Sequence, residues 1–161
     1  MLHECGVASK QQVLSVFPDH KDLGNFKAII ECYDEIPCNP CEKYCPFDAI
    51  EIGTNINKRP QLIVDKCVGC GVCVGVCPGL AILLAKLDSD KCVFTIPYEL
   101  SPLPVQDEVW EAVNRAGEVI GLVKIIRVVE SSFKNKTYLV TVETERAFLH
   151  EFVTIGAKVH E

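Results

Sequence analysis

The stretch CVGCGVCVGVCP, residues 67–78, decides how this chain folds. Its cysteines, Cys67, Cys70, Cys73 and Cys77, follow one another closely, and a proline comes directly after the last one. This spacing is typical of runs that hold iron–sulfur clusters, in which the first three thiolates bind one cubane and the fourth binds another. Structural zinc sites usually use two separated cysteine pairs instead. The run therefore favours an iron–sulfur cluster over zinc.

A shorter copy of this run, CNPCEKYCP, lies at residues 38–46. Its cysteines precede their counterparts in the longer run by a constant offset of 32 residues, as Cys38 precedes Cys70. Each copy has an apolar entry and exit, which predicts a strand, a cysteine loop with a short helix that opens near the Cys-Pro, and a second strand. The polar stretch 53–60 would connect the copies. Residues 28–87 resemble the duplicated fold of bacterial-type ferredoxins.

This resemblance implies which cysteines share a cluster. Three thiolates of the long run would bind one [4Fe–4S] cluster, and the last cysteine of the short run would supply the fourth ligand. The predicted ligands of this cluster, called cluster A below, are Cys45, Cys67, Cys70 and Cys73. Gly69 and Gly71 lie inside the cysteine loop, where the backbone has to approach inorganic sulfide closely.

A second cluster, called cluster B, is incomplete in the pattern. Three of its ligands occupy ferredoxin positions: Cys38, Cys41 and Cys77. The remaining position, 32 residues before Cys67, holds Glu35. Four alternatives are open: Cys32 completes a [4Fe–4S] cluster, the three cysteines hold a [3Fe–4S] cluster, the Glu35 carboxylate is a ligand, or the site is empty. We expect an occupied site with Cys32 as the first candidate, because a carboxylate is a hard donor and a poor match for iron–sulfide chemistry.

Residues 88–161 have a different pattern, with runs rich in β-branched residues and turn signals between them. The runs that predict strands are residues 93–96, 119–129 and 138–142. Trp110 is expected in the core of this part, and residues 144–152 predict a short closing helix. Three prolines, Pro97, Pro102 and Pro104, predict an extended connector that leads into it.

The predicted fold class is α+β, a duplicated ferredoxin-like cluster domain followed by a small antiparallel β-barrel or sandwich. The expected domains are an N-terminal extension at residues 1–27, an iron–sulfur domain at residues 28–87 and a β-rich docking domain at residues 88–161. Cys5 is interpreted as a bystander, and Cys92 as an apolar strand residue. The histidines have no partner at ligand spacing: His3, His20, His150 and His160.

Composition and charge limit the remaining classes of function. The net charge is −6, and no segment is basic, which argues against a nucleic-acid partner. The longest apolar stretch, residues 80–85, is too short to cross a membrane, and residues 1–12 do not have the pattern of a signal peptide. Thiolate ligands need a reducing compartment, so we expect a cytoplasmic location. No motif for nucleotide binding or acid–base catalysis is visible, so no catalytic residue is predicted.

The segments IECYDEIPCNPC (residues 30–41) and TIPYELSPLP (residues 95–104) resemble a second, smaller family. Its members are ferredoxin-like subunits associated with FAD-dependent amino-acid dehydrogenases of the sarcosine, opine or hydroxyproline type. The resemblance implies an electron-transfer subunit with a FAD-containing partner, and it makes Cys32 part of the recurring pattern. Two alternatives are a structural or regulatory cluster protein that binds through its β-rich part, and a catalytic subunit that uses an open position in cluster B.

Overall fold

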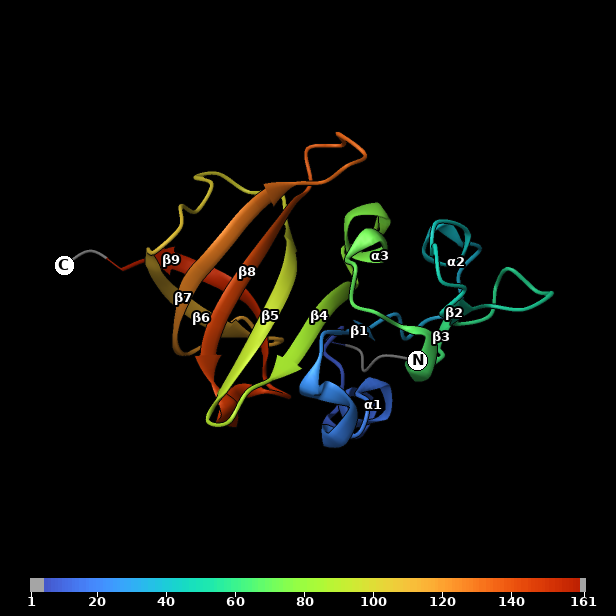
Figure 1. Cartoon of the computed structure of the whole chain (residues 1–161), viewed down its shortest axis with the longest axis horizontal. Helices are drawn as coiled ribbons and strands as arrows, with labels where there is room; N and C mark the ends of the chain where they lie inside the picture. Colours follow the sequence, from blue (N-terminus) through green and yellow to red (C-terminus); the bar gives the residue numbers. More distant parts are fainter. Residues whose placement is uncertain (1–4, 160–161) are drawn as a thin grey trace.

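The computed structural model describes residues 5–159, and Figure 1 shows its two parts side by side. One part carries the short helices α2 (Pro40–Lys43) and α3 (Val72–Val76), and the other is a curved antiparallel sheet. Helix α1 (Lys10–Val16) lies beside the strands that join the two parts. The fold is α+β, with strands far more extensive than helices.

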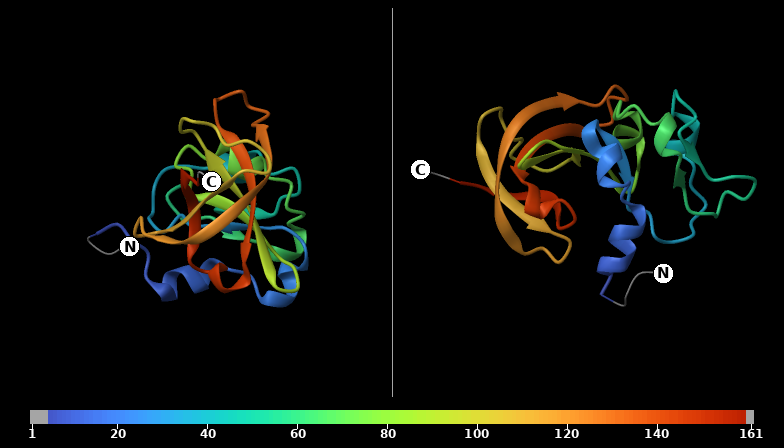
Figure 2. Two further views of the ribbon diagram at one scale, coloured as in Figure 1. Left: turned by 90° about the vertical axis from the view of Figure 1, so that its left-hand side faces the viewer. Right: turned by 60° about the horizontal axis from the view of Figure 1, so that its bottom comes forward.

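Within the described residues a seven-stranded sheet has the order β1-β4-β5-β8-β7-β6-β9. Its strands are β1 (Lys27–Ile30), β4 (Ile82–Leu87), β5 (Lys91–Tyr98), β6 (Val109–Asn114), β7 (Val119–Glu130), β8 (Tyr138–Glu145) and β9 (Phe152–Lys158). Strands β1 and β9 are the edges, so the sheet is open in the part of the chain described. Register shifts in β6 and β7 accompany the strong curvature that Figure 2 shows.

The cluster motifs lie in two halves that exchange strands. The first half runs β1, α2, β2 (Ile50–Glu51), and the second runs β3 (Gln61–Leu62), η2 (Val64–Lys66), α3, β4. Strand β1 pairs with β4, and β2 pairs with β3, both antiparallel. The outer strands of one half thus pair with those of the other. This exchange brings the two cysteine runs together.

Strands β1 and β4 separate two hydrophobic cores. Ile29 and Leu83 face the core of the curved sheet, where Phe94 and Trp110 are also buried. The alternate residues of β1 and β4 face the cluster motifs: Ala28, Ile30, Ile82 and Leu84. Both faces of these strands are therefore covered, which explains their nearly uninterrupted apolar sequence. Strand β5 pairs directly with β4, so the sheet continues across the expected domain boundary at Leu87.

Several sequence predictions are confirmed. The three predicted strands correspond to β5, β7 and β8, and Trp110 is 2% exposed. Cys92 lies in β5 and is fully buried. Residues 53–60 form the loop between β2 and β3.

Three local predictions were wrong. Helices α2 and α3 lie inside the cysteine runs and end before each Cys-Pro, because a residue that precedes proline is pushed out of the helical region, as Cys77 is. The closing helix at residues 144–152 is only the short turn η3 (Arg146–Phe148), and strand β9 follows it. Pro97 belongs to β5 rather than to a connector, at a position where only β8 pairs with β5.

The N-terminal segment before β1 is held by its own helix and a short turn. Helix α1 begins at the capping box of Ser9 and Gln12 and ends at Val16 before Phe17-Pro18. The turn η1 (His20–Gly24) follows and buries Leu23 in the core of the sheet. Residues 1–4, and with them His3, lie outside the described residues.

Candidate iron–sulfur centres

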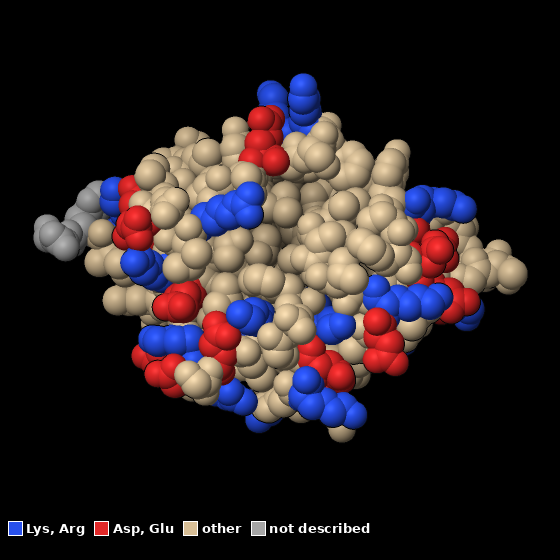
Figure 3. Space-filling model, in the orientation of Figure 1, with Lys and Arg blue, Asp and Glu red and all other residues tan. Residues whose placement is uncertain are grey.

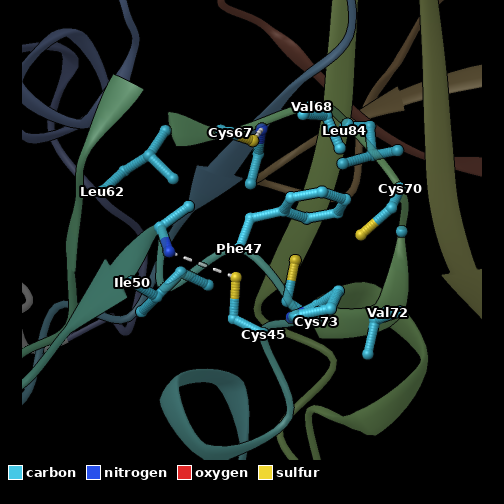
Figure 4. Close-up of a pocket in the computed structure, with 15 residues that line it drawn as sticks. Cys45, Phe47, Ile50, Leu62, Cys67, Val68, Cys70, Val72, Cys73 and Leu84 are labelled. Atoms are coloured by element: carbon cyan, nitrogen blue, oxygen red, sulfur yellow. Dashed lines mark hydrogen bonds between the residues drawn. The ribbon is translucent and has the colours of Figure 1, made fainter. Parts of the chain in front are cut away.

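Four cysteines from both halves of the motif line one cavity. Cys67 follows η2, Cys70 lies in the loop before α3, Cys73 lies in α3, and Cys45 comes from the loop after α2. Figure 4 shows these side chains turned toward a common space, with the Phe47 ring projecting across it. The rest of the lining is apolar apart from backbone groups, and includes Ala28, Ile50, Leu62, Val68 and Leu84. The cysteines are those predicted for cluster A.

The loop around this cavity depends on glycine. Gly69 and Gly71 have φ angles of 69° and 81°, which is the left-handed region that side chains with a Cβ rarely adopt. A Cβ on Gly69 would also lie 2.4 Å from the carbonyl oxygen of Phe26. The chain therefore passes directly against the residue that precedes β1 at this point, and only glycine fits without a shift of the backbone.

Backbone amides point at three of the cysteine sulfurs. The Ala49 amide donates to Cys45 Sγ at 3.3 Å, and the Ala28 amide donates to Cys67 Sγ at 3.4 Å. In the second half the Ala81 amide donates to Cys77 Sγ at 3.4 Å. The contacts of Ala49 and Ala81 repeat the same four-residue spacing. Such hydrogen bonds fix the orientation of a thiolate ligand and tune the potential of a cluster that it holds.

Burial makes the thiol of Cys73 hard to ionise without a metal. The loss of hydration raises its pKa to about 12, and the nearby Cys67, Cys70 and Cys45 raise it further. Iron removes this obstacle, because a thiol that binds a metal is deprotonated outright. A set of soft sulfur donors in an apolar cavity fits an iron–sulfur cluster. Within residues 5–159 no three Cys, His, Asp or Glu side chains gather at a site for a single metal ion.

A second cavity contains the candidates for cluster B. Its cysteines are Cys32, Cys38, Cys41 and Cys77, and its other lining residues are mainly apolar, with Ile30, Pro40, Pro60 and Ile82 among them. Burial raises the pKa of Cys41 to about 11, and burial followed by the charges of Cys77 and Cys38 raises that of Cys32. The donor set thus also fits a cluster with four thiolates.

The structure places Cys32 and Glu35 differently. Cys32 lies two residues beyond the end of β1, so it is free of the strand geometry that would otherwise have constrained it. Glu35 does not line the cavity. Its carboxylate lies 3.4 Å from the Lys58 ammonium, and both side chains are 60% exposed.

The other predicted bystanders lie away from both cavities. Cys5 is exposed, and Cys92 is buried in β5 with its sulfur 3.1 Å from the carbonyl oxygen of Glu145. His20 and His150 stack on each other with ring centroids 5.8 Å apart. His160 lies outside the described residues.

The hairpin loop between β7 and β8 touches the cluster motifs, which the sequence did not predict. The Asn135 side chain donates to the carbonyl of Gly75 in α3 at 2.9 Å, and the Phe133 ring packs edge-on against Tyr44. Leu139 of β8 packs against the core that surrounds the cysteines. These contacts join residues far apart in the chain, and no local pattern signals them. The curved sheet therefore forms part of the wall of the cluster region.

Comparison with known proteins supports the cluster chemistry. Residues 36–81 match the family of 4Fe-4S dicluster domains. The chain is 43% identical over 49 residues to one component of the ion-translocating oxidoreductase complex of Methanosarcina acetivorans, which covers 30% of this chain and 17% of that protein. It is 33% identical over 57 residues to an uncharacterized ferredoxin of Methanocaldococcus jannaschii, covering 35% and 36% of the two chains.

A third relative reaches further along this chain. The protein Pixie of Drosophila melanogaster is 34% identical over 94 residues, which is 52% of this chain and 14% of that protein. The chain thus spans less than two fifths of each of these relatives. No solved structure matches it.

These findings define the class of the protein. It carries a 4Fe-4S ferredoxin domain, and domains of this class hold [4Fe–4S] clusters and carry electrons. In residues 5–159 no helix is long and apolar enough to cross a membrane.

Proposed function

We propose that this chain is an electron-transfer subunit with two [4Fe–4S] clusters whose ligands cross between the halves of the motif. Cluster A is held by Cys45, Cys67, Cys70 and Cys73, and cluster B by Cys32, Cys38, Cys41 and Cys77. The observation that carries the proposal is that these eight cysteines line two cavities in these two groups of four. The clusters supply reversible one-electron chemistry when bound.

The two cavities are close enough for electrons to pass between clusters. Cys41 of the second cavity contributes electrostatically to the raised pKa of Cys73 in the first, so the two thiols are near neighbours. Helices α2 and α3, which carry these cysteines, pack on each other. The protein's part is to hold the two clusters at a fixed separation and to exclude water from the space between them.

The replacement of Cys32 by serine tests the fourth ligand of cluster B. We expect Cys32→Ser to lose cluster B or to retain it as a three-iron cluster, since a hydroxyl is a poor ligand for iron–sulfide chemistry. Iron analysis and electron paramagnetic resonance of anaerobically prepared protein measure this. Glu35→Gln is the matched control and should leave both clusters intact. A Cys32→Ser protein with an unchanged four-iron signal would reject Cys32, and a loss in Glu35→Gln would favour the carboxylate.

The partner in this proposal is a FAD-containing oxidoreductase, of the amino-acid dehydrogenase type implied by the sequence resemblance. One relative is named as a component of an oxidoreductase complex, which supports a subunit role. The chemistry also fits a reducing, cytoplasmic compartment. Near α3, the visible surface in Figure 3 is largely uncharged, so a partner could approach the clusters without desolvating many charges.

The docking surface in this proposal lies on residues 88–161. The loop between β5 and β6 exposes apolar side chains that the fold does not use: Leu100 is 70% exposed and Val105 is 60% exposed. We expect Leu100→Asp/Val105→Asp to weaken association with the flavoprotein while both clusters remain. Anaerobic co-purification with flavin analysis, and reduction of the clusters by the isolated partner, measure this. Unchanged affinity would place the docking surface elsewhere, and co-purification without any flavoprotein would favour a structural or regulatory role.

A further inference from the structure

A nearly buried ion pair joins the curved sheet to the residue before Cys32. Arg115 lies in the turn between β6 and β7, and its guanidinium forms a two-pronged contact with the Glu31 carboxylate. The Nε atom donates to Oε2 at 2.7 Å, and the NH2 group donates to Oε1. Both side chains are 11% exposed. A bidentate pair of this kind fixes direction as well as distance.

Arg115 also holds a third segment. Its NH1 group donates to the carbonyl oxygens of His150 at 2.7 Å and of Glu151 at 3.2 Å, in the turn that precedes β9. The guanidinium therefore connects the end of β1, the β6–β7 turn and the approach to β9. Its donors are used on both sides, so the side chain is fixed in place.

The residues on either side of Cys32 are both held by this group. Tyr33 is 5% exposed, and its hydroxyl donates to Glu31 Oε2 at 3.2 Å. The Glu31 amide donates to the carbonyl of Ala81, which is the last backbone contact before the chain leaves β1. Cys32 stands between two anchored neighbours, at the edge of the second cavity. Nothing else on the cysteine's own loop has regular secondary structure until α2 begins at Pro40.

We propose that Arg115 is a positioning residue for Cys32, so that cluster B depends on the curved sheet although all of its ligands lie outside that sheet. The inference rests on the proposed role of Cys32 as a ligand. Without Arg115 the Glu31 carboxylate would be left nearly buried and without its partner, which strongly favours movement toward water. Glu31 and Cys32 are consecutive, so such a movement draws the sulfur away from the cavity.

The test compares Arg115→Met with Arg127→Met, a matched change at an exposed arginine of β7. Each anaerobically prepared protein is exposed to an iron chelator, and the loss of cluster A and cluster B is followed by electron paramagnetic resonance. Arg115→Met should make cluster B about 10-fold more labile, the lower end of the range for groups that orient metal ligands, with cluster A as the internal reference. Arg127→Met should match the wild type.

Two further variants separate positioning from general stability. Arg115→Lys keeps the charge but not the forked geometry, so it should fold and still release cluster B faster than wild type. Cys32→Ser shows whether the ligand assignment itself holds. If Cys32→Ser leaves cluster B unchanged, the proposed ligand is wrong; if it removes cluster B while Arg115→Lys and Arg115→Met leave its lability unchanged, or release both clusters alike, the positioning role of Arg115 is overturned.

Discussion

Cys45→Ser is expected to destroy cluster A and to remove about half of the iron, although Cys45 belongs to the short cysteine run and the other three ligands belong to the long one. The expectation follows from the cavity, where the Cys45 side chain faces those of Cys67, Cys70 and Cys73. Its sulfur is also oriented by the Ala49 amide. Iron and acid-labile sulfide analysis, with electron paramagnetic resonance of the reduced protein, measure the loss.

The equivalent change in the second half provides the comparison. Cys77→Ser should remove cluster B and spare cluster A, because Cys77 lines only the second cavity. Cys5→Ser, outside both cavities, should change neither. The crossed arrangement would be contradicted if Cys45→Ser lost cluster B and retained cluster A.

Gly69→Ala is expected to be the most damaging change of a non-ligand residue. The positive φ of Gly69 costs an alanine about 1–2 kcal/mol, and the added Cβ would meet the backbone of Phe26 at 2.4 Å, where no flexible side chain can yield. The loop that carries Cys67 and Cys70 has to shift. We expect a lower free energy of unfolding and the loss of cluster A, measured by denaturant titration and iron analysis.

Gly53→Ala isolates the conformational part of this cost. Gly53 has a similar φ of 83°, and a Cβ there would meet nothing within 4 Å. Its substitution should cost only the φ penalty and leave both clusters in place. Equal destabilisation by the two alanines would show that contact with Phe26 does not constrain the cysteine loop.

The parts of the structure that could be predicted from the sequence are those with local causes. The spacing of the cysteines restricts which sulfurs can face one cavity, and the two groups of four that line the cavities are those expected from it. Strands β7 and β8 are visible as runs of β-branched residues, and Cys92 and Trp110 are buried as expected.

The parts that could not be predicted depend on contacts between distant residues or on competing local preferences. The pairing of β4 with β5, the reach of Asn135 to Gly75 and the Arg115–Glu31 pair leave no mark at any fixed sequence spacing. The helix expected at residues 144–152 reflects helix-forming Ala, Leu and Glu residues, but pairing of β9 with β6 ends it after a single turn. Tertiary pairing outweighs weak propensity there.

A redox titration of the anaerobically purified protein, followed by electron paramagnetic resonance, tests the central claim most directly. The account predicts reversible uptake of about two electrons per chain, one for each cluster. It also predicts that the signals of the reduced clusters broaden when both are reduced, because the two cavities are adjacent. Uptake of a single electron would contradict the second cluster, and a protein whose iron and sulfide show no reversible reduction would contradict the electron-transfer function.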